Sequence, residues 1–80
     1  MTIEEKIITL IKENSNCESA IYRHSNIIDD LSIDSFDRLM IINAIEDEYA
    51  IEVDTNDIDR FRTVDDIVLA LESKYVNPVQ

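Results

Sequence analysis

The 80-residue sequence has no glycine, no tryptophan, one proline, one cysteine and one histidine. Without glycine, the chain lacks both of the common glycine-rich loops that cradle phosphate groups. Cys17 and His24 are too few for a zinc site, and a single cysteine cannot form a disulfide within the chain. An unpaired cysteine fits a reducing compartment, and we expect a cytoplasmic protein.

Basic side chains are also scarce, because 7 Lys and Arg stand against 18 Asp and Glu, for a net charge of −11. This balance excludes a nucleic-acid binder that neutralises phosphates. No apolar run approaches the ~20 residues of a membrane span, and the N-terminus lacks the basic start of a signal peptide. Since 45% of the residues are hydrophobic, we expect one acidic, soluble, monomeric domain over residues 1–80, with a frayed tail at 76–80.

The residues that catalysis or a metal requires are not suitably arranged. A Ser-His-acid triad needs an imidazole beside the nucleophile, and nothing places His24 near a particular serine. The best calcium-loop frame starts at Asp30, but it has Ser35 where glycine is required and Ile41 where a bidentate Glu is required. Cys17 lies next to an acidic residue, which disfavours a thiolate. We therefore expect neither an enzyme nor a metal site.

The apolar periodicity predicts an all-α bundle with three main helices, at about 2–14, 35–49 and 64–75, and a short helix near 57–61. Capping boxes mark the first and the last main helix, since Thr2 precedes Glu5 and Thr63 precedes Asp66 by three residues.

The connections carry a less regular pattern. Residues 15–33 show no clean period, and we expect a packed loop whose apolar side chains enter the core. These side chains are Ile21, Tyr22, Ile27, Ile28, Leu31 and Ile33. Ile51 and Val53 alternate with acidic residues, but a segment of four residues without a partner cannot form a sheet. We expect an extended loop there.

The second helix has two apolar faces when its residues are placed at ~100° intervals. The predicted core stripe consists of Leu39, Ile41, Ile42, Ile45 and Tyr49. The opposite face carries Phe36, Met40, Asn43 and Asp47. A helix that is packed on one side only has no need of apolar residues on the second face.

The start of this helix carries a recognisable motif. Asp34 and Ser35 are both suited to cap a helix, and capping is the ordinary role of a serine there. The segment Asp29–Asp37, DDLSIDSFD, resembles the attachment site of acyl carrier proteins. The pattern continues in register over residues 27–71, through Leu39, Ala44–Tyr49, Ile51, Val53, Thr63 and Val64. The chain is identified as a member of the carrier-protein family.

The resemblance implies a carrier function and the chemistry that goes with it. A phosphopantetheinyl transferase would attach 4′-phosphopantetheine from coenzyme A to the hydroxyl of Ser35, and the thiol of this arm would carry acyl groups as thioesters. Asp34 matches the aspartate that is thought to help the transferase's metal site. A helix N-terminus also favours the attached phosphate. The protein itself would catalyse nothing.

The resemblance also implies that the second helix docks on basic patches of acyl-transferring and synthase enzymes. The docking residues would be Phe36, Asp37, Met40, Asn43, Ala44 and Asp47. Acidic charge speeds such encounters. Glu46, Asp47 and Glu48 lie at the negative end of the helix, where further negative charge is unfavourable. That the helix keeps these charges favours a role in recognising partners. The alternative is a solvated acidic face with no specific role.

Three positions depart from the family pattern and leave the pathway open. Ser32 replaces a small residue that is often glycine, which is tolerable if the backbone avoids positive φ. Met40 stands where fatty-acid carriers have Glu, and Phe36 is bulkier than the usual Leu. The carrier could serve fatty-acid, polyketide or other specialised biosynthesis. The alternative is an unmodified carrier-fold module that only binds partners, and the intact pair Asp34-Ser35 favours the first.

Overall fold

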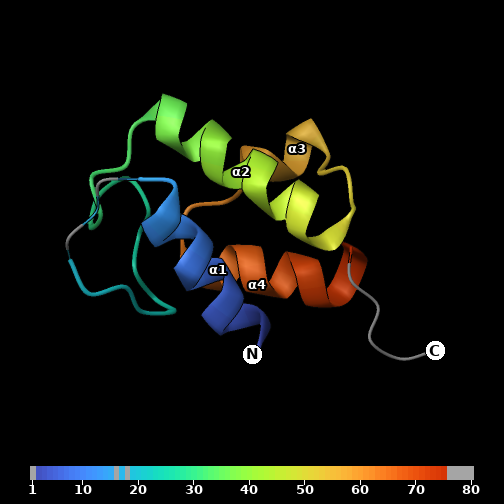
Figure 1. Ribbon diagram of the computed structural model, residues 1–80, viewed down its shortest axis with the longest axis horizontal. Coiled ribbons are helices and arrows are strands. Elements are labelled where there is room, and N and C mark those ends of the chain that lie inside the picture. The colour runs from blue at the N-terminus through green and yellow to red at the C-terminus, as the bar shows by residue number, and fades with distance from the viewer. Residues whose placement is uncertain (1, 16, 18, 76–80) are drawn as a thin grey trace.

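A computed structural model describes residues 2–15, 17 and 19–75. Its elements, in chain order, are α1 (Ile3–Glu13), α2 (Ser35–Tyr49), α3 (Thr55–Ile58), α4 (Val64–Ala70) and the π-helical turn η1 (Leu71–Tyr75). α2 crosses above α1 and α4, and the long α1–α2 loop fills one end of the molecule (Figure 1). The predicted all-α bundle is confirmed. The expected frayed tail lies outside the described residues.

Both predicted capping boxes are present. At the start of α1, the Glu5 amide donates to Thr2 Oγ1 at 3.1 Å and the Thr2 amide donates to Glu5 Oε1 at 2.9 Å. At the start of α4, the Asp66 amide donates to Thr63 Oγ1 and the Thr63 amide donates to Asp66 Oδ2, both at 3.1 Å. Each box satisfies two amides that the helix itself leaves without partners.

The short helix and the last main helix differ from their predicted bounds. The short helix is Thr55–Ile58 rather than 57–61, because Asp54 caps it and accepts from the Asn56 amide at 2.8 Å. The last main helix is α-helical only to Ala70 and continues to residue 75 as a π turn. In this turn the Tyr75 hydroxyl accepts from the Asp54 amide at 2.9 Å, a contact between residues 21 positions apart.

The core is rich in isoleucine and draws on the helices and on the α1–α2 loop. Its fully buried side chains are Ile7, Ile11, Ile27, Ile41, Ile45, Val64, Ile67, Val68 and Leu71. The packed-loop prediction holds for Ile21, Ile27, Leu31 and Ile33 and is wrong for Tyr22 and Ile28, which are exposed. The loop pairs with the chain before α4 through an isolated bridge between Asn26 and Thr63. Residues 51–54 are extended without forming a strand, as predicted.

Leu39 was predicted in the core but is 53% exposed. It lies at the edge of the buried stripe of α2, whose buried members are Ile41, Ile42 and Ile45. None of the helices in the described ranges is long and apolar enough to cross a membrane.

Candidate functional site

Ser35 is the first residue of α2 and is exposed. Asp34 is the N-cap, with φ −80° and ψ 178°, and its Oδ1 accepts from the Asp37 amide at 2.8 Å. The Ser35 hydroxyl makes no hydrogen bond to other residues among those the structure describes. Of the two residues that could cap the helix, the aspartate does so, and the serine hydroxyl stays available for chemistry.

The loop that leads to Ser35 is held by its own hydrogen bonds. Asn26 Oδ1 accepts from the amides of Ile28 at 3.0 Å and Asp29 at 2.8 Å. Asp30 Oδ2 accepts from the Asn26 amide at 2.8 Å. Ser32 then adopts φ 55°. The expectation that serine is tolerated at this position assumed that its φ is not positive, and this assumption is not met. A left-handed conformation costs about 1–2 kcal/mol in a residue with a Cβ.

A polar cavity of about 370 Å³ adjoins the start of α2. Three carboxylates, those of Asp30, Asp34 and Asp37, line it together with Ser32 and Cys17. The immediate surroundings of Ser35 are therefore acidic, and these carboxylates would repel a negatively charged group attached there.

The predicted docking face is on the solvent side of α2. Phe36 is 69% exposed and Met40 is 40% exposed, and Asn43 and Asp47 are exposed as well. Asp37 and Ala44, which complete the predicted set, are half-buried. Leu39 is also exposed beside this face, which was not predicted, and its position at the edge of the core stripe was the only available signal.

The acidic end of α2 is organised differently from what its charge suggested. Glu46 Oε2 accepts from the Val53 amide at 2.8 Å. Glu48 Oε2 lies 3.3 Å from Lys6 Nζ. Glu46 and Glu48 thus have partners within the fold. These partners explain why the two negative charges are tolerated at this end of the helix without any role in recognising other proteins. The argument for recognition from charge remains only for Asp47.

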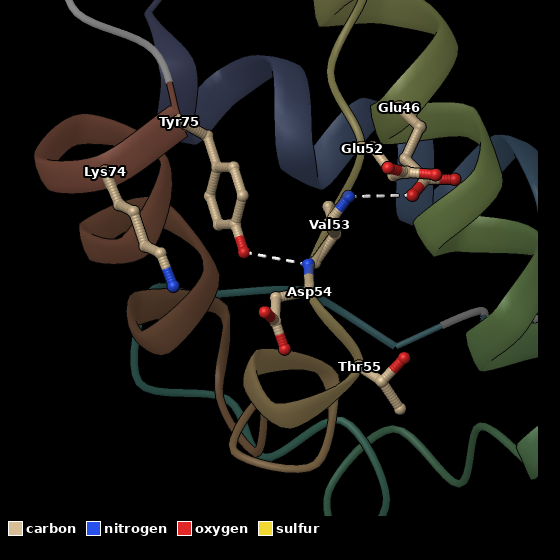
Figure 2. Close-up of a pocket in the computed structure, with 7 residues that line it drawn as sticks. All are labelled: Glu46, Glu52, Val53, Asp54, Thr55, Lys74 and Tyr75. Atoms are coloured by element: carbon tan, nitrogen blue, oxygen red, sulfur yellow. Dashed lines mark hydrogen bonds between the residues drawn. The ribbon is translucent and has the colours of Figure 1, made fainter.

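A second polar cluster, which the sequence analysis did not find, lies beyond this end of α2 (Figure 2). Its cavity of about 490 Å³ is lined by Glu46, Glu52, Val53, Asp54, Thr55, Lys74 and Tyr75. Asp57 accepts hydrogen bonds from Lys74 Nζ at 2.7 Å and from the Tyr75 hydroxyl. These bonds lower the pKa of Asp57, and burial followed by the bond to Asp57 raises the pKa of Tyr75. The cluster fastens η1 to α3.

The comparisons with known proteins agree on one family. The family model "Phosphopantetheine attachment site" matches residues 5–71. The chain belongs to the acyl carrier protein family. Acyl carrier proteins of Rickettsia typhi and Rickettsia prowazekii are each 33% identical over 73 residues, which cover 90% of this chain and 85% of the relative.

The fold comparison points the same way. A chain described as an acyl carrier protein from Mycobacterium tuberculosis superimposes with a TM-score of 0.78 at 28% identity. The match covers 85% of this chain and 92% of that one. The cofactor of this family is phosphopantetheine, and its members are carriers rather than catalysts. The matched range includes Asp34 and Ser35, where the acidic surroundings and the exposed hydroxyl have just been described.

Proposed function

We propose that Ser35 bears the 4′-phosphopantetheine arm and that the protein carries acyl groups on it as thioesters, in fatty-acid, polyketide or related specialised biosynthesis. The observation that carries this proposal is that Asp34 and Ser35 have different roles at the start of α2. Asp34 caps the helix, whereas Ser35 is exposed and has no competing hydrogen bond among the described residues. The N–H groups of the first turn favour a phosphate at this end.

Asp34 is also placed to assist the modification. One of its carboxylate oxygens, Oδ1, is engaged by the Asp37 amide. The carboxylate has a second oxygen, and the side chain lies on the surface beside Ser35. In a complex with the transferase, this oxygen is available to the metal site that the family resemblance implies.

We propose that partner enzymes dock on the exposed face of α2, defined by Phe36, Asp37, Leu39, Met40, Asn43, Ala44 and Asp47. Phe36, Leu39 and Met40 are exposed at 69%, 53% and 40% and lie within two turns of one helix. Exposed apolar side chains that lie together are typical of a binding surface, whereas single ones are common on any protein. An apolar contact ringed by carboxylates fits a partner that offers an apolar depression among basic side chains. The charges set the approach, and the apolar contact supplies affinity.

The deciding experiment is intact-mass measurement after incubation with coenzyme A and a broad-specificity phosphopantetheinyl transferase. The wild-type chain gains the mass of one phosphopantetheine, whereas Ser35→Ala gains none. Ser32→Ala, which removes the other serine of the motif region, still gains it. Circular dichroism of Ser35→Ala matches the wild type because Asp34 keeps the cap.

A folded wild-type chain that gains no mass would overturn the carrier proposal. The alternative would then apply, in which the protein is an unmodified carrier-fold module that only binds partners. Gain of mass in Ser35→Ala would place the attachment at another residue.

Met40 is the residue we expect to bear on the choice of pathway. It is 40% exposed on the docking face and replaces the Glu of fatty-acid carriers. Met40→Glu should therefore raise turnover with fatty-acid synthase enzymes, whose docking patches are basic. Unchanged or lower turnover would show that Met40 does not determine the choice of partner.

A further inference from the structure

Arg38 is the basic residue nearest to Ser35 in the sequence, and its side chain is weakly engaged. Its side chain is only 24% exposed, yet the nearest carboxylate oxygen, Asp59 Oδ1, lies 3.9 Å from Nη2. That distance exceeds the range of a hydrogen bond. A guanidinium carries five N–H donors, and within the described part of the chain those of Arg38 bond to no acceptor.

The other ion pairs of the structure are tighter. Lys6 lies 3.3 Å from Glu48, and Lys74 lies 2.7 Å from Asp57. Arg23 hydrogen-bonds Asp65 and also lies 3.3 Å from Glu4. The partner of Arg38 holds it weakly as well, because the Asp59 side chain is 77% exposed. Among the ion pairs of the described residues, the one at Arg38 is the least costly to break.

The space around Arg38 can accept a change of partner. The guanidinium lines a cavity of about 300 Å³, together with Asn26, Ile28, Asp29, Asp59, Phe61 and Arg62. Ile28 and Phe61 give the cavity apolar walls, so Arg38 borders open space on the side of Asp59 and is not packed tightly against it.

Arg38 is also placed to reach a group on Ser35. Side chains three positions apart on a helix are neighbours, with Cβ atoms about 5–6 Å apart. Each side chain leans towards the N-terminus of its helix, so Arg38 leans towards Ser35. A phosphodiester on Ser35 would stand beside Asp34 and Asp37, and a nearby cation would offset their repulsion.

We propose that Arg38 is the positioning residue for the phosphodiester of an arm on Ser35, and that it exchanges Asp59 for that phosphate when the arm is attached. This inference rests on the proposed function. The exchange replaces an ion pair at 3.9 Å with charge-assisted hydrogen bonds, for which the planar guanidinium is well suited.

The exchange has a consequence for α3. Asp59 follows α3, a helix of four residues with none buried. The beginning of α3 is held by Tyr75 and Lys74 and does not depend on Arg38. Losing Arg38 therefore loosens only the end of α3, where the Arg60 amide donates to Asp57 O at 3.0 Å and the Phe61 amide donates to Ile58 O at 3.1 Å.

The test uses apo and arm-bearing protein, with the modification first verified by intact mass. In the arm-bearing form, the ¹⁵N–¹H signal of Arg38 Nε shifts and that of the exposed Arg60 does not. The ³¹P signal of the phosphodiester moves in Arg38→Gln and stays unchanged in Arg60→Gln. Amide exchange at Arg60 and Phe61 becomes roughly two- to five-fold faster on modification, which corresponds to the loss of one exposed ion pair.

A second variant tests the exchange without the arm. In apo Asp59→Asn, Arg38 has already lost its partner, so the amides at the end of α3 exchange as in the arm-bearing wild type. Should Arg38→Gln fail to fold, Arg38→Lys replaces it, since that variant keeps the charge and loses the planar fork.

Either of two results overturns the inference. One is an Arg38 Nε signal that is the same in the apo and arm-bearing forms. The other is an equal ³¹P shift in the Arg38 and Arg60 variants. Both are measured on protein that carries the arm, so they leave the proposed function standing. Absence of the arm from the wild-type chain would instead contradict the proposed function itself.

Discussion

The two ends of α2 differ in how far their polar groups are engaged. At the first turn, the Ser35 hydroxyl has no partner among the described residues, Phe36 is 69% exposed, and Arg38 stands 3.9 Å from Asp59. At the last turns, Glu46 accepts from the Val53 amide at 2.8 Å and Glu48 pairs with Lys6 at 3.3 Å. One helix therefore has an end whose polar groups are largely unengaged and an end whose polar groups are paired within the fold.

The comparison teaches that charge by itself does not mark a binding surface. The acidic run at the end of α2 looked like a recognition feature, yet two of its three members serve the fold. The start of α2 has more unused interaction capacity, both polar and apolar. Groups left without partners in an otherwise satisfied structure are the better indication of function.

The first prediction tests the C-terminal end of α2 by removing the carboxylate of Glu46, which bonds to the Val53 amide. Glu46→Ala should lower the free energy of unfolding by about 1–3 kcal/mol, because the Val53 amide loses its acceptor in a part-buried site. Asp47→Ala changes the charge equally and should stay within about 0.5 kcal/mol. Urea unfolding of both variants measures the difference. Equal effects would mean that charge, and not the hydrogen bond, decides stability at this end.

The second prediction concerns the apolar side chains near the start of α2. Leu39 and Leu69 are exposed to similar extents, 53% and 49%, but only Leu39 lies near Ser35. Leu39→Ala should lower kcat/KM for the phosphopantetheinyl transferase about five- to tenfold, since roughly half of a leucine's burial energy is lost from the docked complex. Leu69→Ala is the control and should leave kcat/KM unchanged. Equal losses would remove Leu39 from the docking face.

The third prediction uses the two left-handed residues that flank α2. Ser32 before the helix and Ala50 after it both have φ 55° in a chain without glycine. Ser32→Gly and Ala50→Gly should each raise the free energy of unfolding by about 0.5–1 kcal/mol, because glycine adopts this conformation without a steric cost. Ala70→Gly, in α4, should lower it by about 1 kcal/mol. Thermal or urea unfolding would show the opposite signs.

The smallest expected effect is the acid sensitivity of the contact that fastens η1 to α3. The pKa of Asp57 is lowered in the fold by its bonds to Lys74 and Tyr75. Its contribution to stability is therefore present above the ordinary value of 3.8 and is lost as pH falls from there through the folded pKa.

Tyr75→Phe removes the bond to Asp57 and also the acceptor of the Asp54 amide. It should lower Tm near neutral pH, and the difference from wild type should shrink as Asp57 becomes protonated. Tyr22→Phe, at an exposed tyrosine, is the matched control and should leave Tm unchanged. A Tm difference of the same size at low and at neutral pH would show that the Asp57 bond does not contribute to it.

Local signals explain how much of the fold was predictable. The capping residues Thr2, Asp34 and Thr63 act within four residues of themselves, so the starts of α1, α2 and α4 were read correctly. The cap that begins α3, Asp54, is also a local signal, but it was not predicted. The π turn was not predicted either; its last residue, Tyr75, contacts Asp54, which is 21 positions away.

For the candidate site, the sequence predicted the exposed stripe of Phe36, Met40, Asn43 and Asp47 through helical periodicity alone. It misplaced Leu39, which lies at the edge of the buried stripe of α2 and is exposed. It also could not see that Glu46 and Glu48 have partners, because Val53 and Lys6 meet them only after the chain folds.

The sequence by itself determined the helices, their caps, the apolar core pattern and the motif around Ser35, because each depends on neighbours within a few turns. Only the tertiary structure decided which polar groups are engaged and which stay available. Those partners come from distant segments, as Asp59 does for Arg38 and Tyr75 does for Asp54. The pattern of hydrophobic residues encodes which face of a helix is buried, whereas the pairing of charges depends on where separate elements meet in space.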